Sequence, residues 1–253
     1  MRRARLAGRP VTALLLDYGH TLVTYSRPQA ALREAYSRIA TLLSGAGPGP
    51  SADVLLAQVH DRIEASIHHH AARGAPRELD IASLHQAAYT ALGRPLTPAL
   101  VDEVMRIEQE AWWQGVRVGP GVIETLGRLR EAGLQLGLCS NAPYRVESLR
   151  EQLAQLGLAS QLDSSTFSAE VGWRKPAPEL FAAALAALGA SAEETVMVGD
   201  AVREDVVGAR TAGLRVIRSR EFHDDPDRSV VPELVIDRFA ALPAALGLTN
   251  TCS

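Results

Sequence analysis

VTALLLDYGHTL, residues 11–22, is the stretch that decides the fold. Its first six residues are apolar except for Thr12, and such a nearly continuous run is typical of a strand buried on both faces of a parallel sheet. The run ends at Asp17, followed by Gly19 and Thr21 in a segment that reads as a turn. The sequence therefore places a carboxylate at the end of a buried strand.

Downstream of residue 115, strand and helix patterns alternate. Apolar runs typical of strands lie at residues 134–139, 195–198, 214–217 and 234–236, with a short one at 168–171. Helical patterns lie at residues 122–132, 145–156, 178–188, 204–212 and 240–246. This alternation predicts right-handed crossovers and a doubly wound parallel sheet, which is an α/β fold. In such sheets, ligands bind at the carboxyl ends of the strands.

Residues 28–114 interrupt the alternation with helical patterns alone. Helices are expected at residues 29–43, 52–72, 79–92 and 98–114, separated by loops rich in glycine and proline. Ser51 and Thr97 are expected to cap two of these helices. We therefore predict an α/β core domain formed by residues 1–27 and 115–253, with an all-helical domain, residues 28–114, inserted after the first strand.

The composition excludes several classes of function. Of the 253 residues, 47% are hydrophobic and 22% charged, as in ordinary globular chains, and the formal net charge of -3 offers nothing to nucleic acid or an anionic membrane. No apolar run reaches the ~20 residues that span a bilayer. The basic residues 1–5 precede too short an apolar run for a signal peptide, so we expect a cytoplasmic protein. Cys139 and Cys252 predict neither a disulfide framework nor a zinc site.

Polar residues stand where the predicted strands end. Ser140 and Asn141 follow the strand at residues 134–139, and Lys175 lies in a basic turn before the helix at 178–188. Gly199 and Asp200 end the strand at 195–198, and Asp205 comes five residues later. Each feature alone is typical of a turn or a helix cap. Together with Asp17 they predict one cluster of functional groups at the carboxyl edge of the sheet.

This order of residues resembles the haloacid dehalogenase-like (HAD) superfamily. Asp17, Thr21 and Leu22 match its first motif, Ser140 its second, and Lys175 in KPAPELF its third. The fourth motif matches GDAVREDVVGA, residues 199–209, in which Ala201 stands where relatives often have serine. The resemblance extends over residues 14–246, and the helical insert is similar to the C1 cap of the phosphatase-type branch.

The resemblance implies a role for each of these residues. Asp17 is the nucleophile, which divides phosphoryl transfer into two displacements. Mg²⁺ takes oxygen ligands, and Asp17, the Gly19 carbonyl and Asp200 are its implied direct ligands. Asp205 completes the metal site through water or from behind. The Lys175 ammonium, the Ser140 hydroxyl and the backbone N–H of Asn141 are implied to hold the phosphoryl group.

Gly19 departs from the family pattern. Phosphatases of the family usually have a second aspartate here, which protonates the leaving group, and such acid–base help is worth ~10²–10⁴ in rate. Three interpretations are open: slow hydrolysis of substrates with good leaving groups, a proton from His20 or from a cap residue, or a metal site with little turnover. An imidazole such as that of His20 has an ordinary pKa of about 6.5, which suits this role.

From these observations we expect a Mg²⁺-dependent hydrolase, most simply a phosphatase of a small phosphorylated metabolite. One alternative is a catalytically impaired binding protein that keeps the fold. A second is 2-haloacid dehalogenation, which needs the nucleophile but no metal; Asp200 and Asp205 argue against it, because clustered carboxylates repel one another without a cation. The sequence specifies neither the substrate nor the oligomeric state.

Overall fold

The structure, a computed structural model, describes residues 3–46 and 49–248. Met1, Arg2 and Cys252 lie outside these residues. The chain forms two compact units: Met1–Tyr25, Arg117–Ala142 and Leu153–Ser253 make the first, and Ser26–Val116 with Pro143–Gln152 makes the second. The second unit thus includes a segment that the sequence pattern did not assign to the insert. That it acts as a cap stays a prediction.

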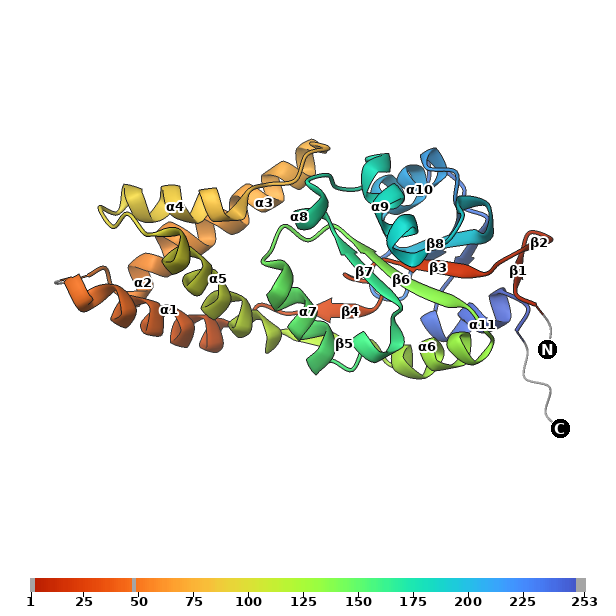
Figure 1. Ribbon diagram of the computed structural model, residues 1–253, viewed down its shortest axis with the longest axis horizontal. Helices are drawn as coiled ribbons and strands as arrows, with labels where there is room; N and C mark the ends of the chain where they lie inside the picture. The colour runs from red at the N-terminus through yellow and green to blue at the C-terminus, as the bar shows by residue number, and fades with distance from the viewer. Residues whose placement is uncertain (1–2, 47–48, 249–253) are drawn as a thin grey trace. The chain divides into compact units, whose positions relative to one another are not determined.

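A six-stranded sheet is the centre of the first unit (Figure 1). Its order is β10 (Leu234–Ile236), β9 (Arg215–Ser219), β8 (Thr195–Gly199), β3 (Ala13–Leu16), β6 (Gln135–Ser140) and β7 (Ser164–Phe167). Every neighbouring pair is parallel. Because β3 lies between β8 and β6, the sheet grows from it in both directions, which confirms the doubly wound α/β prediction. All four β3 side chains are buried, as the apolar run predicted.

Helices cover both faces of this sheet. In Figure 1, α9 (Pro178–Leu188) and α10 (Gly208–Thr211) lie on one face, and α6 (Val122–Glu131) and α11 (Leu242–Ala245) on the other. Buried α9 side chains, among them Phe181, pack with Leu15 of β3 and Met197 of β8. Short 3-10 turns at Ala159–Gln161, Ala192–Glu194 and Phe239–Ala241 complete the connections. The sheet core thus fixes the strand ends at which the predicted site lies.

The predicted strand at residues 168–171 is wrong. That segment is the short helix α8 (Ser168–Val171), and the strand β7 lies immediately before it. Glu170 accepts a hydrogen bond from the Phe167 backbone N–H at 2.9 Å, which favours a helical first turn. β7 has the sequence SSTF at the sheet edge, so it shows no apolar run that could have marked it.

Smaller strands lie outside the main sheet. β1 (Arg5–Leu6) and β2 (Arg9–Pro10) form an antiparallel hairpin, and β4 (Val23–Tyr25) pairs with β5 (Val116–Val118). The buried Arg215 side chain donates hydrogen bonds to backbone carbonyls of the hairpin, including Leu6 at 2.9 Å and Pro10 at 2.6 Å. Pairs this short carry little pattern, and none was expected from the sequence.

The second unit is helical, as predicted. It contains α1 (Gln29–Leu43), α2 (Ala52–Leu55), α3 (Asp61–Arg73), α4 (Ile81–Ala91), α5 (Pro98–Trp113) and a 3-10 turn at Ser44–Ala46, and α7 (Val146–Gln155) begins in it. Ser51 and Thr97 cap α2 and α5, as predicted. The helix expected at residues 52–72 is divided by a π-helical turn, Leu56–His60. No helix within the described residues is long and apolar enough to cross a membrane.

A buried carboxylate lies in the core of the second unit. Glu108, on α5, accepts a hydrogen bond from the Tyr36 hydroxyl at 2.6 Å, and its other oxygen lies 2.7 Å from His60 Nδ1. His85 Nε2 is 3.7 Å from the first of these oxygens. Glu108 thereby links α1, the π-helical turn and α4 through side chains that are themselves buried.

The pKa values of the two histidines beside Glu108 shift in opposite directions. Burial opposes the charged form of both rings. At His60 the short contact with Glu108 outweighs burial and raises the pKa, whereas at His85 burial prevails and lowers it. Burial also works against the charge of Glu108, but its partners, first His60, hold its pKa below the usual value. The short contact therefore favours a charged pair of His60 and Glu108, and burial favours the neutral form of His85.

We predict that Glu108→Ala destabilises the protein by roughly 3–5 kcal/mol, because it leaves buried donors without their acceptor. The free energy of unfolding from urea denaturation measures this. Glu103→Ala is the matched control on the same helix: its partner Arg106 is partly exposed, so the loss is at most about 1 kcal/mol. Equal losses for the two variants would contradict the buried-cluster interpretation.

Candidate active site

Asp17 is the first residue after β3 and lies at the centre of the site. Its backbone N–H donates to the Val198 carbonyl at 2.9 Å, which extends the pairing between β3 and β8 by one residue. The next turn is held by the Tyr18 carbonyl, which accepts from the N–H groups of Leu22 and Val23. The sheet and this turn together present the buried carboxylate of Asp17 at the carboxyl edge.

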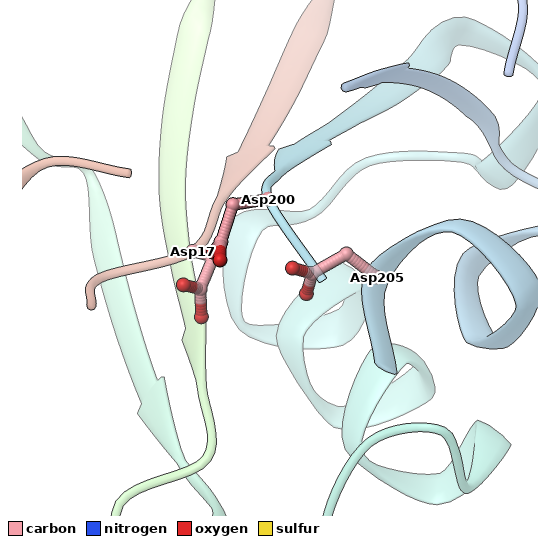
Figure 2. Close-up of side chains that lie close together, drawn as sticks. All are labelled: Asp17, Asp200 and Asp205. Carbon is pink, nitrogen blue, oxygen red and sulfur yellow. The ribbon is translucent and has the colours of Figure 1, made fainter. Parts of the chain in front are cut away.

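Asp200 and Asp205 approach Asp17 from the end of β8. Figure 2 shows the three carboxylates close together, and ligand oxygens of all three lie within 4.8 Å of one another. Asp205 lies in a π-helical turn, Val202–Val207, and accepts from the Ala201 N–H at 3.0 Å. A Cβ on Gly199 would lie 2.3 Å from the Asp205 carboxyl carbon, so only glycine leaves room for this side chain.

Lys175 joins two of these carboxylates. Its Nζ lies 2.5 Å from Asp17 Oδ1 and 2.6 Å from Asp205 Oδ1, and the side chain is 2% exposed. Lys175 is also the sole lysine of the 253-residue sequence; every other member of the Lys and Arg set is arginine. An ammonium is a compact point charge, which fits between two carboxylates where a planar guanidinium would not.

Asn141 holds the Lys175 backbone in place. Its side-chain amide donates to the Lys175 carbonyl at 3.0 Å and accepts from the Lys175 N–H at 2.7 Å. Ser140, the last residue of β6, is buried beside it. The structure places Asn141 beside the Lys175 backbone, with its side-chain amide bonded to protein groups. Its role toward a ligand stays a prediction.

Crowding of negative charge is visible in the pKa values. Burial, opposed by Lys175 and reinforced by Asp205 and Asp200, raises the pKa of Asp17 to about 8. Burial and Asp205 also raise the pKa of Asp200. Burial works against the Lys175 charge, but Asp17 and Asp205 outweigh it and raise the Lys175 pKa. One ammonium therefore does not neutralise three carboxylates, and the cluster is short of positive charge.

The donor set fits a hard divalent cation. One ammonium faces three buried acidic side chains, and carboxylate oxygens are the ligands that Mg²⁺ prefers. Asp17 and Asp200 each come from a strand end. Both oxygens of Asp205 contact protein groups, Lys175 and the Ala201 N–H, and both oxygens of Asp200 also have a protein partner. The residues present suit Mg²⁺, which takes oxygen ligands.

Gly19 and His20 occupy the turn after Asp17. A Cβ on Gly19 would lie 2.9 Å from the Tyr25 hydroxyl oxygen, so the Tyr25 side chain fills the space that a residue at position 19 would use. The left-handed backbone of this turn belongs to His20, with φ of 56°, and not to Gly19. The His20 ring packs edge-on against Tyr25, with centroids 5.6 Å apart.

Two side chains contact the Asp200 carboxylate, and the sequence analysis named only one of them. Thr21, which matched the first motif, donates its hydroxyl to Asp200 Oδ1 at 3.3 Å. His223 Nδ1 lies 2.6 Å from Asp200 Oδ2, and the His223 ring centroid is 5.7 Å from that of His20. His223 stands in a charged loop after β9 with no periodic pattern, so no signal in the sequence pointed to it.

Comparison with known proteins gives the family. Residues 11–213 match the model of the haloacid dehalogenase-like hydrolases, and the chain belongs to this hydrolase family. It is 33% identical over 151 residues to glyceraldehyde 3-phosphate phosphatase of Methanopyrus kandleri, covering 58% of this chain and 64% of the relative. It is 30% identical over 177 residues to phosphoglycolate phosphatase of Caulobacter vibrioides, covering 67% of this chain and 73% of that protein.

Other matches are shorter or show the fold alone. The chain is 44% identical over 92 residues to phosphoserine phosphatase of Thermus thermophilus, which is 36% of either chain, so it spans well under two thirds of several curated relatives. A 2-haloacid dehalogenase from Pseudomonas syringae superposes with a TM-score of 0.68 at 24% identity, over 94% of this chain and 98% of that one. The resemblance expected from the four motifs is confirmed.

We predict that Lys175 resists amine-specific reagents in the folded protein. Reductive methylation at mildly alkaline pH should modify it at least about tenfold more slowly than in urea, because burial excludes the reagent and two carboxylates keep the amine protonated. Mass spectrometry reads one site without ambiguity, since the chain has no second lysine. The α-amine of the same chain is the internal control. Equal rates in the folded and unfolded chain would contradict the buried ion pairs.

Proposed function

We propose that this hydrolase is a Mg²⁺-dependent phosphatase that forms a phosphoaspartate on Asp17 while hydrolysing a small phosphorylated metabolite. The observation that carries the proposal is the buried cluster in which Lys175 contacts Asp17 and Asp205, with Asp200 within ligand distance. Relatives named for glyceraldehyde 3-phosphate and phosphoglycolate support a small substrate.

The Asp17 carboxyl group would need a bound cation to become an effective nucleophile. Burial and the neighbouring carboxylates raise its pKa to about 8, so its charged form is disfavoured while no cation is bound. Asp17, Asp200 and the Gly19 carbonyl would hold Mg²⁺ directly, with Asp205 behind them. When bound, Mg²⁺ supplies the missing positive charge and neutralises the phosphoryl oxygens. A bound cation would thus favour the ionised form of the nucleophile in the same state that can accept a dianionic phosphate.

The remaining groups would orient the phosphoryl group. Lys175 already touches the Asp17 oxygen, so an incoming phosphoryl oxygen meets the ammonium beside the nucleophile. Ser140 and the Asn141 N–H come from the end of β6, the strand next to β3, and would donate to the other oxygens. These donors are fixed by the sheet and by the Asn141 contacts before substrate binds, which lowers the cost of ordering them.

We predict that turnover of an aryl phosphate requires Mg²⁺ and stops in excess chelator. Asp17→Asn abolishes turnover, because an amide keeps the shape of the carboxyl group and loses its nucleophilic charge. Asp200→Asn weakens Mg²⁺ binding more than Asp205→Asn, since a direct ligand loses more than a group behind it. Steady-state kinetics over a range of Mg²⁺ concentrations measures each effect.

Asp53→Asn, an exposed aspartate on α2, is the matched control and should retain full turnover. Full activity in chelator would refute the metal site, and full activity of Asp17→Asn would refute the nucleophile. Absence of turnover in the wild type across a panel of phosphorylated metabolites, with Mg²⁺ bound, would instead favour the impaired binding protein, to which Gly19 points.

The missing carboxyl group at position 19 generates a separate prediction. The wild type favours aryl or acyl phosphates over alkyl phosphates, because an alkoxide leaving group gains most from a proton. If His20 supplies that proton, His20→Ala slows alkyl substrates more than aryl ones. Gly19→Asp raises alkyl turnover, and more so with Tyr25→Ala, which clears the space that the new side chain needs. Equal wild-type rates for both classes, unaffected by His20→Ala, would place the acid elsewhere.

A further inference from the structure

The loop that carries His223 is attached to the residues around Asp200. Buried Arg218, on β9, donates to the Asp200 carbonyl at 3.2 Å and to the Asp225 carbonyl at 2.6 Å. Asp225 in turn accepts from the Val202 N–H at 2.7 Å. The loop is thus bonded to the chain at Asp200 itself and two residues beyond it, so its position relative to the Asp200 carboxylate is fixed.

From this arrangement we infer that His223 is a positioning residue, which sets the orientation of the Asp200 carboxylate for the cation. Its Nδ1 lies 2.6 Å from Asp200 Oδ2, whereas Thr21 donates to Oδ1 at the longer distance of 3.3 Å. Hydrogen bonds weaken with distance, so His223 is the stronger restraint. With one donor on each oxygen, the carboxylate cannot rotate, and its remaining lone pairs keep one direction toward the cation.

Packing does not account for His223. Its side chain is 45% exposed, whereas that of Asp200 is 7% exposed. A half-exposed imidazole contributes little to the core, so its short contact with a buried carboxylate is the feature that needs an explanation. Groups that hydrogen-bond metal ligands typically change metal affinity by about 10–100-fold when they are removed. This inference rests on the proposed function, because it assumes that Asp200 binds Mg²⁺.

Three variants at position 223 test it. His223→Ala removes the donor, His223→Asn retains an amide nitrogen where Nδ1 lies, and His223→Gln moves that nitrogen outward to the place of Nε2. Titration calorimetry of the substrate-free protein with Mg²⁺ gives the affinity independently of turnover. We expect about 10–100-fold weaker binding for His223→Ala, recovery for His223→Asn, and little recovery for His223→Gln. His68→Ala, an exposed imidazole on α3, is the matched control and leaves the affinity unchanged.

The outcomes separate this inference from the proposed function. If Asp200→Asn weakens Mg²⁺ binding while His223→Ala leaves it unchanged, the positioning role is refuted and the metal site stands. Equal weakening for the Ala and Asn variants, at unchanged melting temperature without Mg²⁺, also refutes it, because the donor would not be what matters. If the wild type binds no Mg²⁺, both the proposed metal site and the positioning role of His223 are refuted. A His223→Ala variant that does not fold leaves the comparison of Asn with Gln as the deciding one.

Discussion

The contact of the Lys175 ammonium with Asp17 and Asp205 is the interaction on which the site depends. It joins the turn before α9, the end of β3 and the π-helical turn after β8, three segments far apart in the sequence. Removing one partner from a buried ion pair leaves an uncompensated buried charge, which is strongly destabilising. The contact therefore favours the fold in which all three segments meet. That the chain uses arginine everywhere else and lysine here agrees with a need for a compact charge.

The cluster around Asp17 carries more acidic side chains than Lys175 can compensate, and this excess favours the binding of a cation. A raised Asp17 pKa disfavours the carboxylate, so under the proposed function the binding of a cation and the activation of the nucleophile would be coupled. The second unit shows a contrasting arrangement, in which the Glu108 carboxylate has its hydrogen-bond partners, His60 and Tyr36, within the protein. Balanced charge there suits a structural role, whereas unbalanced charge at Asp17 suits a site that binds something.

The sequence predicted most of the fold, because buried parallel strands and amphipathic helices have strong patterns. Pattern and spacing predicted the boundaries of α1 and α9 and the helix caps Ser51 and Thr97. They also predicted that Asp17, Ser140, Lys175 and Asp200 lie at the same edge of the sheet. The sequence did not predict the features that depend on tertiary contacts. The π-helical turns, which place His60 and Asp205, are too short to show a periodicity of their own in the sequence. The strand β7 at the sheet edge has no apolar run. His223 lies in a loop whose path no local pattern encodes, and Tyr25 lies in the short strand β4, which carries little pattern.

The most direct test of the central claim is to trap the phosphoaspartate. The protein is mixed with an acyl or aryl phosphate and Mg²⁺, quenched in acid within the first turnover, digested and examined by mass spectrometry. The account predicts one phosphoryl group, on the peptide that contains Asp17 and on that residue itself. Turnover of the substrate with no phosphoryl group on Asp17, or with the group on another residue, would contradict it.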